Sequence, residues 1–467
     1  MMTSLFSRRP ALALLGLGLS LGLSAGLAGC QADIAAPTAS AGPLDFTSYV
    51  AVGNSLTAGY SDGGLYNESI ATSYPALLAQ QFAATGKGPA SFVQPSFSAA
   101  RKDGSGYLKL LAAGGQLGPV APGPANQFLG ELVAYTGGVL AGSGQPQLEP
   151  YAGAQPDNLG VPGISVLSSV SALTLNMAPY GIINPFYERL LTAAEKPTKD
   201  YVTYIGQKNP TFFTCWMGSN DVLGFATAGG VVAAGNPFGG LTDTTRFGIG
   251  YRAIVQTISK NGTVKGAVAN IPNVTSLPYF TTVPVATVIA GIKASTPTAS
   301  LYIRTGTNTV REATSADLLT LTARSIIGTP STTAGNPFPV GVGLGTAAGQ
   351  SNPLPSEFVL DAAEITAVVN RTNDLNGIIA KTALRFKVPV ADMNVFFTGI
   401  AQRSIATNAV SNTTAYVTGN LFGLDGVHPT PRGYAIVANE WVRVINAYYG
   451  ANIGTVDANL YRGILFP

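Results

Sequence analysis

Short segments of apolar and β-branched residues that alternate with helical patterns are the feature that most limits how this chain can fold. The segments cover residues 46–52, 211–216, 264–269 and 388–391. Runs that are apolar on both sides are typical of parallel strands buried between two layers of helices. Between and after them, apolar residues recur at helical spacing over residues 361–386 and 431–449. The alternation predicts an α/β fold with a parallel sheet.

Local signals mark where two of the helices begin. Thr430 is a natural N-cap, Pro431 suits the first helical position, and Gly450 marks the end of that helix. Ser73, followed by Pro75, predicts an N-cap and a first turn for a helix that runs through residues 77–82.

Two stretches interrupt the alternation, and we interpret both as insertions into a single domain that spans residues 46–467. The first, at about residues 86–156, is rich in loops with weak helical patches. The second, at about residues 282–355, has a β-like piece near residues 300–311 followed by sequence rich in glycine, proline and threonine.

Composition excludes several classes of function. The formal net charge of +3 falls to about +1 without Arg8 and Arg9, which lie in a leader, so there is no basic face for nucleic acid. A single histidine and two cysteines, Cys30 and Cys215, cannot build a zinc cluster or a disulfide framework. The sequence therefore predicts no metal and no cofactor.

The first 29 residues read as a lipoprotein signal peptide. Arg8 and Arg9 precede an apolar stretch that ends in Leu-Ala-Gly before Cys30. The end of this segment resembles the bacterial lipobox, in which the cysteine is acylated and becomes the mature N-terminus. Residues 30–45 would then form a lipidated, flexible tether. We expect an exported bacterial protein that Cys30 anchors in the cell envelope, at the outer membrane or cell surface.

Four short polar segments carry the candidate chemistry. They are Gly-Asn-Ser-Leu at residues 53–56, Asn-Leu-Gly-Val-Pro-Gly at 158–163, Gly-Ser-Asn-Asp at 218–221 and Asp-Gly-Val-His at 425–428. Each alone has an ordinary structural explanation as a turn or a loop before a helix. Together they supply a hydroxyl nucleophile, an imidazole base, a carboxylate to orient it, and donors for an oxyanion.

At these residues the sequence resembles the SGNH hydrolases, also called the GDSL esterase/lipase family. The blocks occur in the family's order between Phe46 and Tyr449, with Asn54 in place of the usual aspartate. The resemblance looks closest to exported lipoproteins of Bacteroidetes-like bacteria. It implies a three-layer α/β/α sandwich around a parallel sheet of about five strands.

The resemblance also implies roles for individual residues. Ser55 would be the nucleophile, His428 the base and then acid, and Asp425 the residue that orients His428. The oxyanion hole would consist of the Ser55 and Gly163 backbone N–H groups and the Asn220 side chain, with Gly160 as the alternative to Gly163. The departure at Asn54 puts the geometry of the nucleophile's turn in question more than the activity.

The leading expectation is a lipid-anchored serine carboxylic ester hydrolase that works through an acyl-enzyme on a small-molecule ester. One alternative is an O-acetyl esterase that uses the same residues on a glycan or polysaccharide. A different class is a surface binding lipoprotein that keeps the fold without catalysis, which the intact serine, histidine, aspartate and asparagine argue against. The sequence does not indicate the acyl-chain length, the alcohol or the oligomeric state.

Overall fold

The computed structural model describes residues 38–113, 116–120, 132–140, 144–171 and 184–466. Residues 39–467 form one compact unit. The expected lipidation site, Cys30, lies outside the described residues, as does the predicted signal peptide.

A parallel sheet lies at the centre of this unit. It has the order β1 (Tyr49–Gly53), β6 (Phe212–Trp216), β7 (Lys265–Ala269) and β13 (Val390–Ala391). A fifth segment continues it beside β1, where Ala51 forms a parallel bridge with Asn158. The Ala51 N–H donates to the Asp157 carbonyl at 2.9 Å, and the Leu159 N–H donates back to Ala51 at 2.8 Å. The four apolar segments, with the segment at Asn158 as a fifth, thus form the expected parallel sheet of about five strands.

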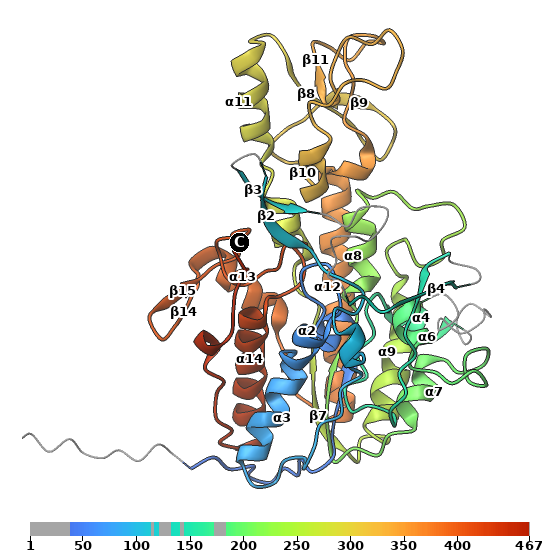
Figure 1. The fold of residues 1–467 in the computed structure, drawn as a ribbon, viewed down its shortest axis with the longest axis vertical. Helices are drawn as coiled ribbons and strands as arrows, with labels where there is room; N and C mark the ends of the chain where they lie inside the picture. The colour runs from blue at the N-terminus through green and yellow to red at the C-terminus, as the bar shows by residue number, and fades with distance from the viewer. Residues whose placement is uncertain (1–37, 114–115, 121–131, 141–143, 172–183, 467) are drawn as a thin grey trace, which may run out of the picture. The chain divides into compact units, whose positions relative to one another are not determined.

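Helices cover both faces of this sheet (Figure 1). On one side α3 (Tyr74–Ala84) packs against α14 (Pro431–Tyr449). On the other side α9 (Thr244–Ile258) packs between α7 (Tyr201–Gly206) and α12 (Ala362–Phe386). This arrangement confirms the α/β/α sandwich.

The helix ends follow the local signals with one exception. The Thr430 side chain accepts from Gly433, and Gly450 ends α14 in the left-handed conformation with φ 69°. Ser73 occupies the N-cap position of α3, but its side chain makes no capping bond there. Its hydroxyl instead accepts a hydrogen bond from the Gln94 amide at 3.2 Å, because the chain after α3 folds back across the helix start.

The core between the layers is dense and aromatic. Every residue of β1 and β6 is buried. The Tyr74 ring stacks on Trp441 with centroids 5.4 Å apart, and Trp216 meets Trp441 edge-on at 6.3 Å. Burial of each large apolar side chain stabilises a fold by about 1.5–3 kcal/mol. These contacts hold the carboxyl ends of β1 and β6 in a fixed relation.

The two stretches predicted as insertions are built from small antiparallel elements. In the first, β2 (Lys109–Ala113) pairs with β3 (Gln116–Val120), and β4 (Tyr135–Val139) pairs with β5 (Pro146–Leu148). The buried Arg189 side chain links two segments of this stretch, because it donates hydrogen bonds to the carbonyls of Pro95, Ser96 and Glu149.

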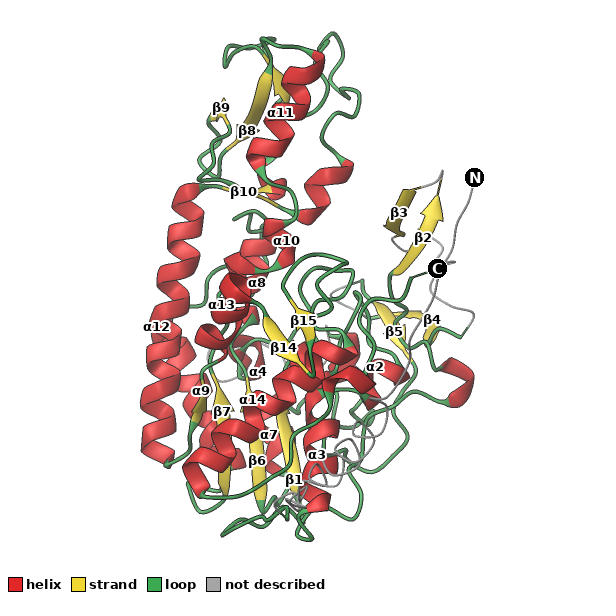
Figure 2. Ribbon diagram, turned by 90° about the vertical axis from the view of Figure 1, so that its left-hand side faces the viewer, coloured by secondary structure: helices red, strands yellow, loops and turns green. Residues whose placement is uncertain are grey.

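The second stretch has an apolar cluster of its own, which includes Leu301, Ile303 and Leu354. It contains α11 (Val285–Ser295) and the strands β8 (Ser300–Arg304), β9 (Val310–Glu312) and β11 (Val342–Gly343). Figure 2 shows it as a lobe at one end of the compact unit, beyond one end of α12. A strand pair, β10 (Leu318–Leu319) with β12 (Val359–Leu360), connects it to the start of α12.

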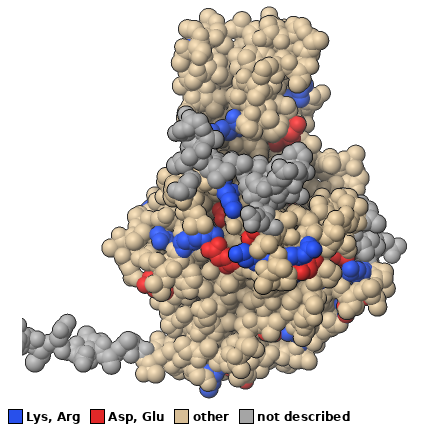
Figure 3. Space-filling model, viewed as in Figure 1, with Lys and Arg blue, Asp and Glu red and all other residues tan. Residues whose placement is uncertain are grey.

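Shorter elements complete the fold. They are α1 (Ser55–Ala58), α2 (Asn67–Ala71), α4 (Val166–Ser169), α6 (Pro185–Glu188), α8 (Asn220–Thr227), α10 (Pro278–Thr281), α13 (Met393–Arg403), β14 (Ile405–Thr407) and β15 (Val410–Asn412). Charged side chains are sparse on the face shown in Figure 3 and gather mainly in one band across it.

Candidate active site

Ser55 lies at the carboxyl end of β1, as the first residue of α1. The Asn54 side-chain oxygen caps this short helix by accepting the Leu56 N–H at 3.0 Å. Gly53 allows the tight turn, since a Cβ there would lie 1.9 Å from the Thr57 hydroxyl. The amide of Asn54 therefore supports the turn, although its buried Nδ2 finds no partner among the described residues.

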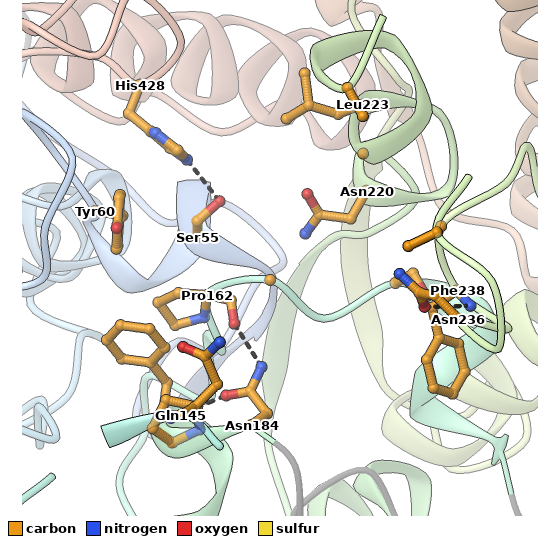
Figure 4. Close-up of a pocket in the computed structure, with 18 of the residues that line it drawn as sticks. Ser55, Tyr60, Gln145, Pro162, Asn184, Asn220, Leu223, Asn236, Phe238 and His428 are labelled. Carbon is orange, nitrogen blue, oxygen red and sulfur yellow. Dashed lines mark hydrogen bonds between the residues drawn. The ribbon is translucent and has the colours of Figure 1, made fainter. Parts of the chain in front are cut away.

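His428 and Asp425 complete a chain of hydrogen bonds with Ser55. The Nε2 atom of His428 lies 2.8 Å from the Ser55 Oγ (Figure 4). Its Nδ1 lies 2.8 Å from the Asp425 Oδ2. The other Asp425 oxygen accepts the backbone N–H groups of Val427 and His428 at 2.8 and 2.9 Å. Residues separated by more than 360 positions are thus brought into the order that nucleophile, base and orienting acid require.

The pKa of Asp425 reflects two opposing effects. Burial acts to raise it, but the neighbouring His428 and the hydrogen bonds from His428 and Val427 outweigh burial and hold the pKa below its usual value. Asp425 is therefore ionised near neutral pH. An ionised carboxylate fixes the imidazole in the orientation that leaves Nε2 facing Ser55.

Asn220 and Gly163 lie on the other side of the serine. Asn220 is the first residue of α8, just after β6, and its Nδ2 donates to the Ile164 carbonyl at 2.8 Å, which leaves its second amide hydrogen for another acceptor. Gly163 has φ 79°, a conformation that favours glycine. Both residues line the same cavity as Ser55 and His428.

Gly160 is held differently from Gly163. Its N–H donates to the Asn158 side-chain oxygen at 3.0 Å. A Cβ at Gly160 would lie 2.3 Å from the Ala58 backbone nitrogen, so this glycine permits close packing of two chain segments. Gly163, by contrast, lines the cavity that Ser55 and His428 also line.

Asp221 connects the two segments that carry Asn220 and Gly163. Its carboxylate accepts the N–H groups of Val166 and Leu167 at 2.7 and 3.2 Å. Full burial raises the pKa of Asp221 to about 6. Sequence reasoning included this residue only as a neighbour of Asn220, because the residues it contacts lie more than 50 positions earlier.

The turn at residues 60–64 also contacts the site, and sequence reasoning missed it. The Gly63 N–H donates to Asp425 Oδ2 at 2.8 Å, and Asp62 Oδ1 accepts the Leu424 N–H at 2.8 Å. The Tyr60 ring lies against His428, with centroids 4.7 Å apart. The Ser-Asp-Gly-Gly sequence signals a turn, but nothing local indicates its distant partner.

Two cavities meet at the reacting residues, and Ser55, Asn220, Leu223 and His428 line both. The wide chamber has a volume of about 680 Å³ and is open to solvent. Its further walls include Tyr60, Gly163, Asn184, Phe186, Val231 and Phe238. The narrow chamber is more enclosed and has a volume of about 30 Å³. Its further walls are Leu56, Ser219, Pro272, Val274, Leu277, Phe397, Phe422, Val427 and Pro429.

The residues that the structure describes contain no group of three or more histidine, cysteine, aspartate or glutamate side chains placed to hold a metal ion. Within the same residues, none of the helices has the length and apolar character to cross a membrane.

Comparison with known proteins places these residues in a family context. A search of curated proteins gave no significant match. Among solved structures, the chain is similar to an extracellular lipase from Streptomyces rimosus with 13% identity and a TM-score of 0.30, over 86% of this chain and 99% of that one. The model of the GDSL-like lipase/acylhydrolase family matches residues 49–441, a range that contains every candidate catalytic residue. The chain therefore belongs to the GDSL-like lipase/acylhydrolase family.

Proposed function

We propose that this family member is a serine carboxylic ester hydrolase that acts through an acyl-enzyme. The observation that carries the proposal is the hydrogen-bonded chain from Asp425 through His428 to Ser55, which opens into a cavity that Asn220 also lines. A hydroxyl, a base and an oriented carboxylate in this order are the requirements for nucleophilic attack by serine on an ester.

In the proposed reaction, His428 Nε2 takes the Ser55 hydroxyl proton while Oγ attacks the ester carbonyl carbon. The backbone N–H groups of Ser55 and Gly163 and the free amide hydrogen of Asn220 stabilise the oxyanion. His428 then gives its proton to the leaving alcohol, and the acyl group stays on Ser55. Water, deprotonated by His428, attacks the acyl carbon. The bond from this carbon to Ser55 Oγ breaks, His428 returns the proton to Oγ, and the carboxylic acid leaves.

We also propose that the mature enzyme is an exported lipoprotein, held by lipid on Cys30 at the outer membrane or cell surface. Support comes from the leader sequence, with its arginine pair, apolar stretch and Leu-Ala-Gly-Cys end. Only the part of the expected tether before Ala39 would separate the catalytic domain from the lipid, because Ala41 and Leu44 are buried in the core of the compact unit.

A second candidate is removal of O-acetyl groups from a glycan or polysaccharide. The narrow chamber favours it, because a cavity of about 30 Å³ beside Ser55 matches a small acyl group. The chemistry at Ser55 is the same for both candidates.

The test is hydrolysis of p-nitrophenyl acetate by the purified mature protein, with and without a serine-reactive phosphonate. We expect saturable hydrolysis, its loss on phosphonylation, and an added mass on the peptide that contains Ser55. Ser55→Ala should be inactive and unlabelled. A folded protein that hydrolyses no ester in a broad panel and takes up no phosphonate would instead be a binding protein with a retained fold.

A further inference from the structure

We propose that the narrow chamber is the acyl pocket and that it restricts the enzyme to esters of short acids, acetyl and propionyl, while the wide chamber takes a much larger alcohol. This inference rests on the proposed function, because it assigns the two sides of the ester to the two cavities that meet at Ser55. Its starting observation is the difference in volume between them, about 30 against about 680 Å³.

The direction of the ester follows from the order of the chemical steps. The alcohol must depart before water can attack, and both must pass between the site and solvent on the side that His428 Nε2 faces. The acyl group stays covalently attached to Ser55 throughout this exchange. An exit is therefore needed only on the alcohol side, and the wide chamber is the more open of the two to solvent.

The size limit follows from the volume of the narrow chamber. One water-sized group occupies roughly 10–15 Å³ by this measure, so a chamber of about 30 Å³ holds about two or three such groups. That space suits the carbon chain of an acetyl or propionyl group. A chain of eight carbons does not fit.

The walls of the narrow chamber belong to the protein core, so their displacement costs free energy. Val274 and Phe422 are 2% and 3% exposed, and Leu277 is 9% exposed. The Phe422 ring packs against Phe397 at a centroid distance of 5.7 Å. Close-packed interiors resist expansion, so an added methylene must displace core side chains.

Apart from Ser219 and the shared site residues, every wall of the narrow chamber is apolar. An apolar wall accepts the methyl end of an acyl group and offers nothing to a hydroxylated one. The wide chamber presents flat aromatic surfaces, where Tyr60 meets Phe186 edge-on at 6.0 Å. Such surfaces suit a bulky alcohol such as a sugar ring or an aryl group.

The experiment measures kcat/KM of the full mature protein for p-nitrophenyl acetate, propionate, butyrate and octanoate. We expect the octanoate to be at least about 10-fold poorer than the acetate, since even one surplus methylene in a filled apolar pocket costs about 10-fold or more. Leu277→Ala should raise the octanoate-to-acetate ratio about 10-fold or more above the wild-type ratio.

Leu301→Ala is the matched control, because Leu301 is a fully buried leucine in the distant lobe. It should leave the acyl-chain ratio unchanged. Phe238→Ala, in the wide chamber, should change the preference among acetates of different alcohols and leave the acyl-chain ratio unchanged. Val274→Ala replaces Leu277→Ala if the latter does not fold.

The outcomes separate this inference from the proposed function. If no ester is hydrolysed, the proposed function fails. Two outcomes would overturn the assignment of the chambers and leave the proposed function intact. The first is hydrolysis of esters with a preference for octanoate. The second is a change of the acyl-chain ratio in Phe238→Ala but not in the Leu277 and Val274 variants.

Discussion

Replacement of Asn220 by alanine distinguishes a catalytic role of its side-chain amide from a purely structural role. In the proposed mechanism, the free Nδ2 hydrogen donates to an oxyanion that exists only in the transition state. Loss of such a donor typically lowers kcat by about 10²–10³-fold. Because the ground-state ester carries no such charge, KM should change little.

The same substitution has a stability cost that the structure defines. The Asn220 amide donates to the Ile164 carbonyl at 2.8 Å, and loss of this bond should cost about 1–2 kcal/mol. In a compact unit of this size the cost corresponds to a fall in Tm of about 1–2 °C. A change this small cannot account for a 100-fold loss of kcat in the folded protein.

Asn446→Ala is the matched control. The Asn446 amide donates to the Ile453 carbonyl at 3.0 Å, and its side-chain oxygen accepts the Ile453 N–H at 2.9 Å, at the far end of α14, so its removal breaks two hydrogen bonds away from the site. Steady-state kinetics on p-nitrophenyl acetate and calorimetry on the same preparations give both quantities. We expect a Tm loss in Asn446→Ala at least as large as in Asn220→Ala, and a kcat loss in Asn220→Ala alone. Equal kcat values in the two folded variants would remove Asn220 from the oxyanion hole.

Three other predictions follow from the structure, at Asp425, Asp62 and Asp221, and a fourth follows from the leader sequence. Asp425→Asn should lower kcat by about 10³–10⁴-fold with a small effect on KM, measured by steady-state kinetics, because the imidazole loses its orienting carboxylate. Asp62→Ala should lower kcat about 10-fold and Asp62→Asn should restore most of it, because asparagine keeps an acceptor for the Leu424 N–H and tolerates φ 52°. Burial raises the pKa of Asp221 to about 6, so the folded state binds a proton more tightly than the unfolded state, and the contribution of Asp221 to stability should fall as pH rises from about 4 to 6. The Tm of Asp221→Asn should therefore rise relative to that of the wild type across this pH range. Calorimetric profiles of Tm against pH that run parallel for the two proteins would contradict the assignment. Cys30→Ser should abolish incorporation of labelled fatty acid in cells, and unchanged labelling would place the lipid elsewhere.

The parts of this molecule that were predictable depend on local patterns. The segment at residues 46–52 overlaps β1 and the segment at 211–216 contains β6, because an apolar run short enough to be a strand has few alternatives once it must be buried on both sides. The expected helix at residues 431–449 has those bounds in the structure, since Thr430 and Gly450 determine its ends through their own backbone and side-chain bonds.

The reacting residues were predictable for a different reason. Ser55 and Asn220 follow the carboxyl ends of β1 and β6, and parallel strands bring these ends to one edge of the sheet. His428 lies in the loop just before α14. With only one histidine in the chain, only one imidazole was available as the base. The sequence alone leaves Gly160 and Gly163 as alternatives, and the structure shows that Gly163 lines the cavity of Ser55.

The sequence could not predict contacts made by common turn or core residues whose partners lie far away along the chain. Gly63 and Asp62 read as turn residues, and only the folded chain brings their N–H and carboxylate to the loop of Asp425, 362 positions away. Leu277 and Phe397 read as core, since an apolar side chain that limits a cavity obeys the same periodicity as one that fills it. The acyl preference proposed here depends on the small space left between such side chains. Sequence motifs therefore indicate the reaction, whereas the substrate depends on packing that no motif records.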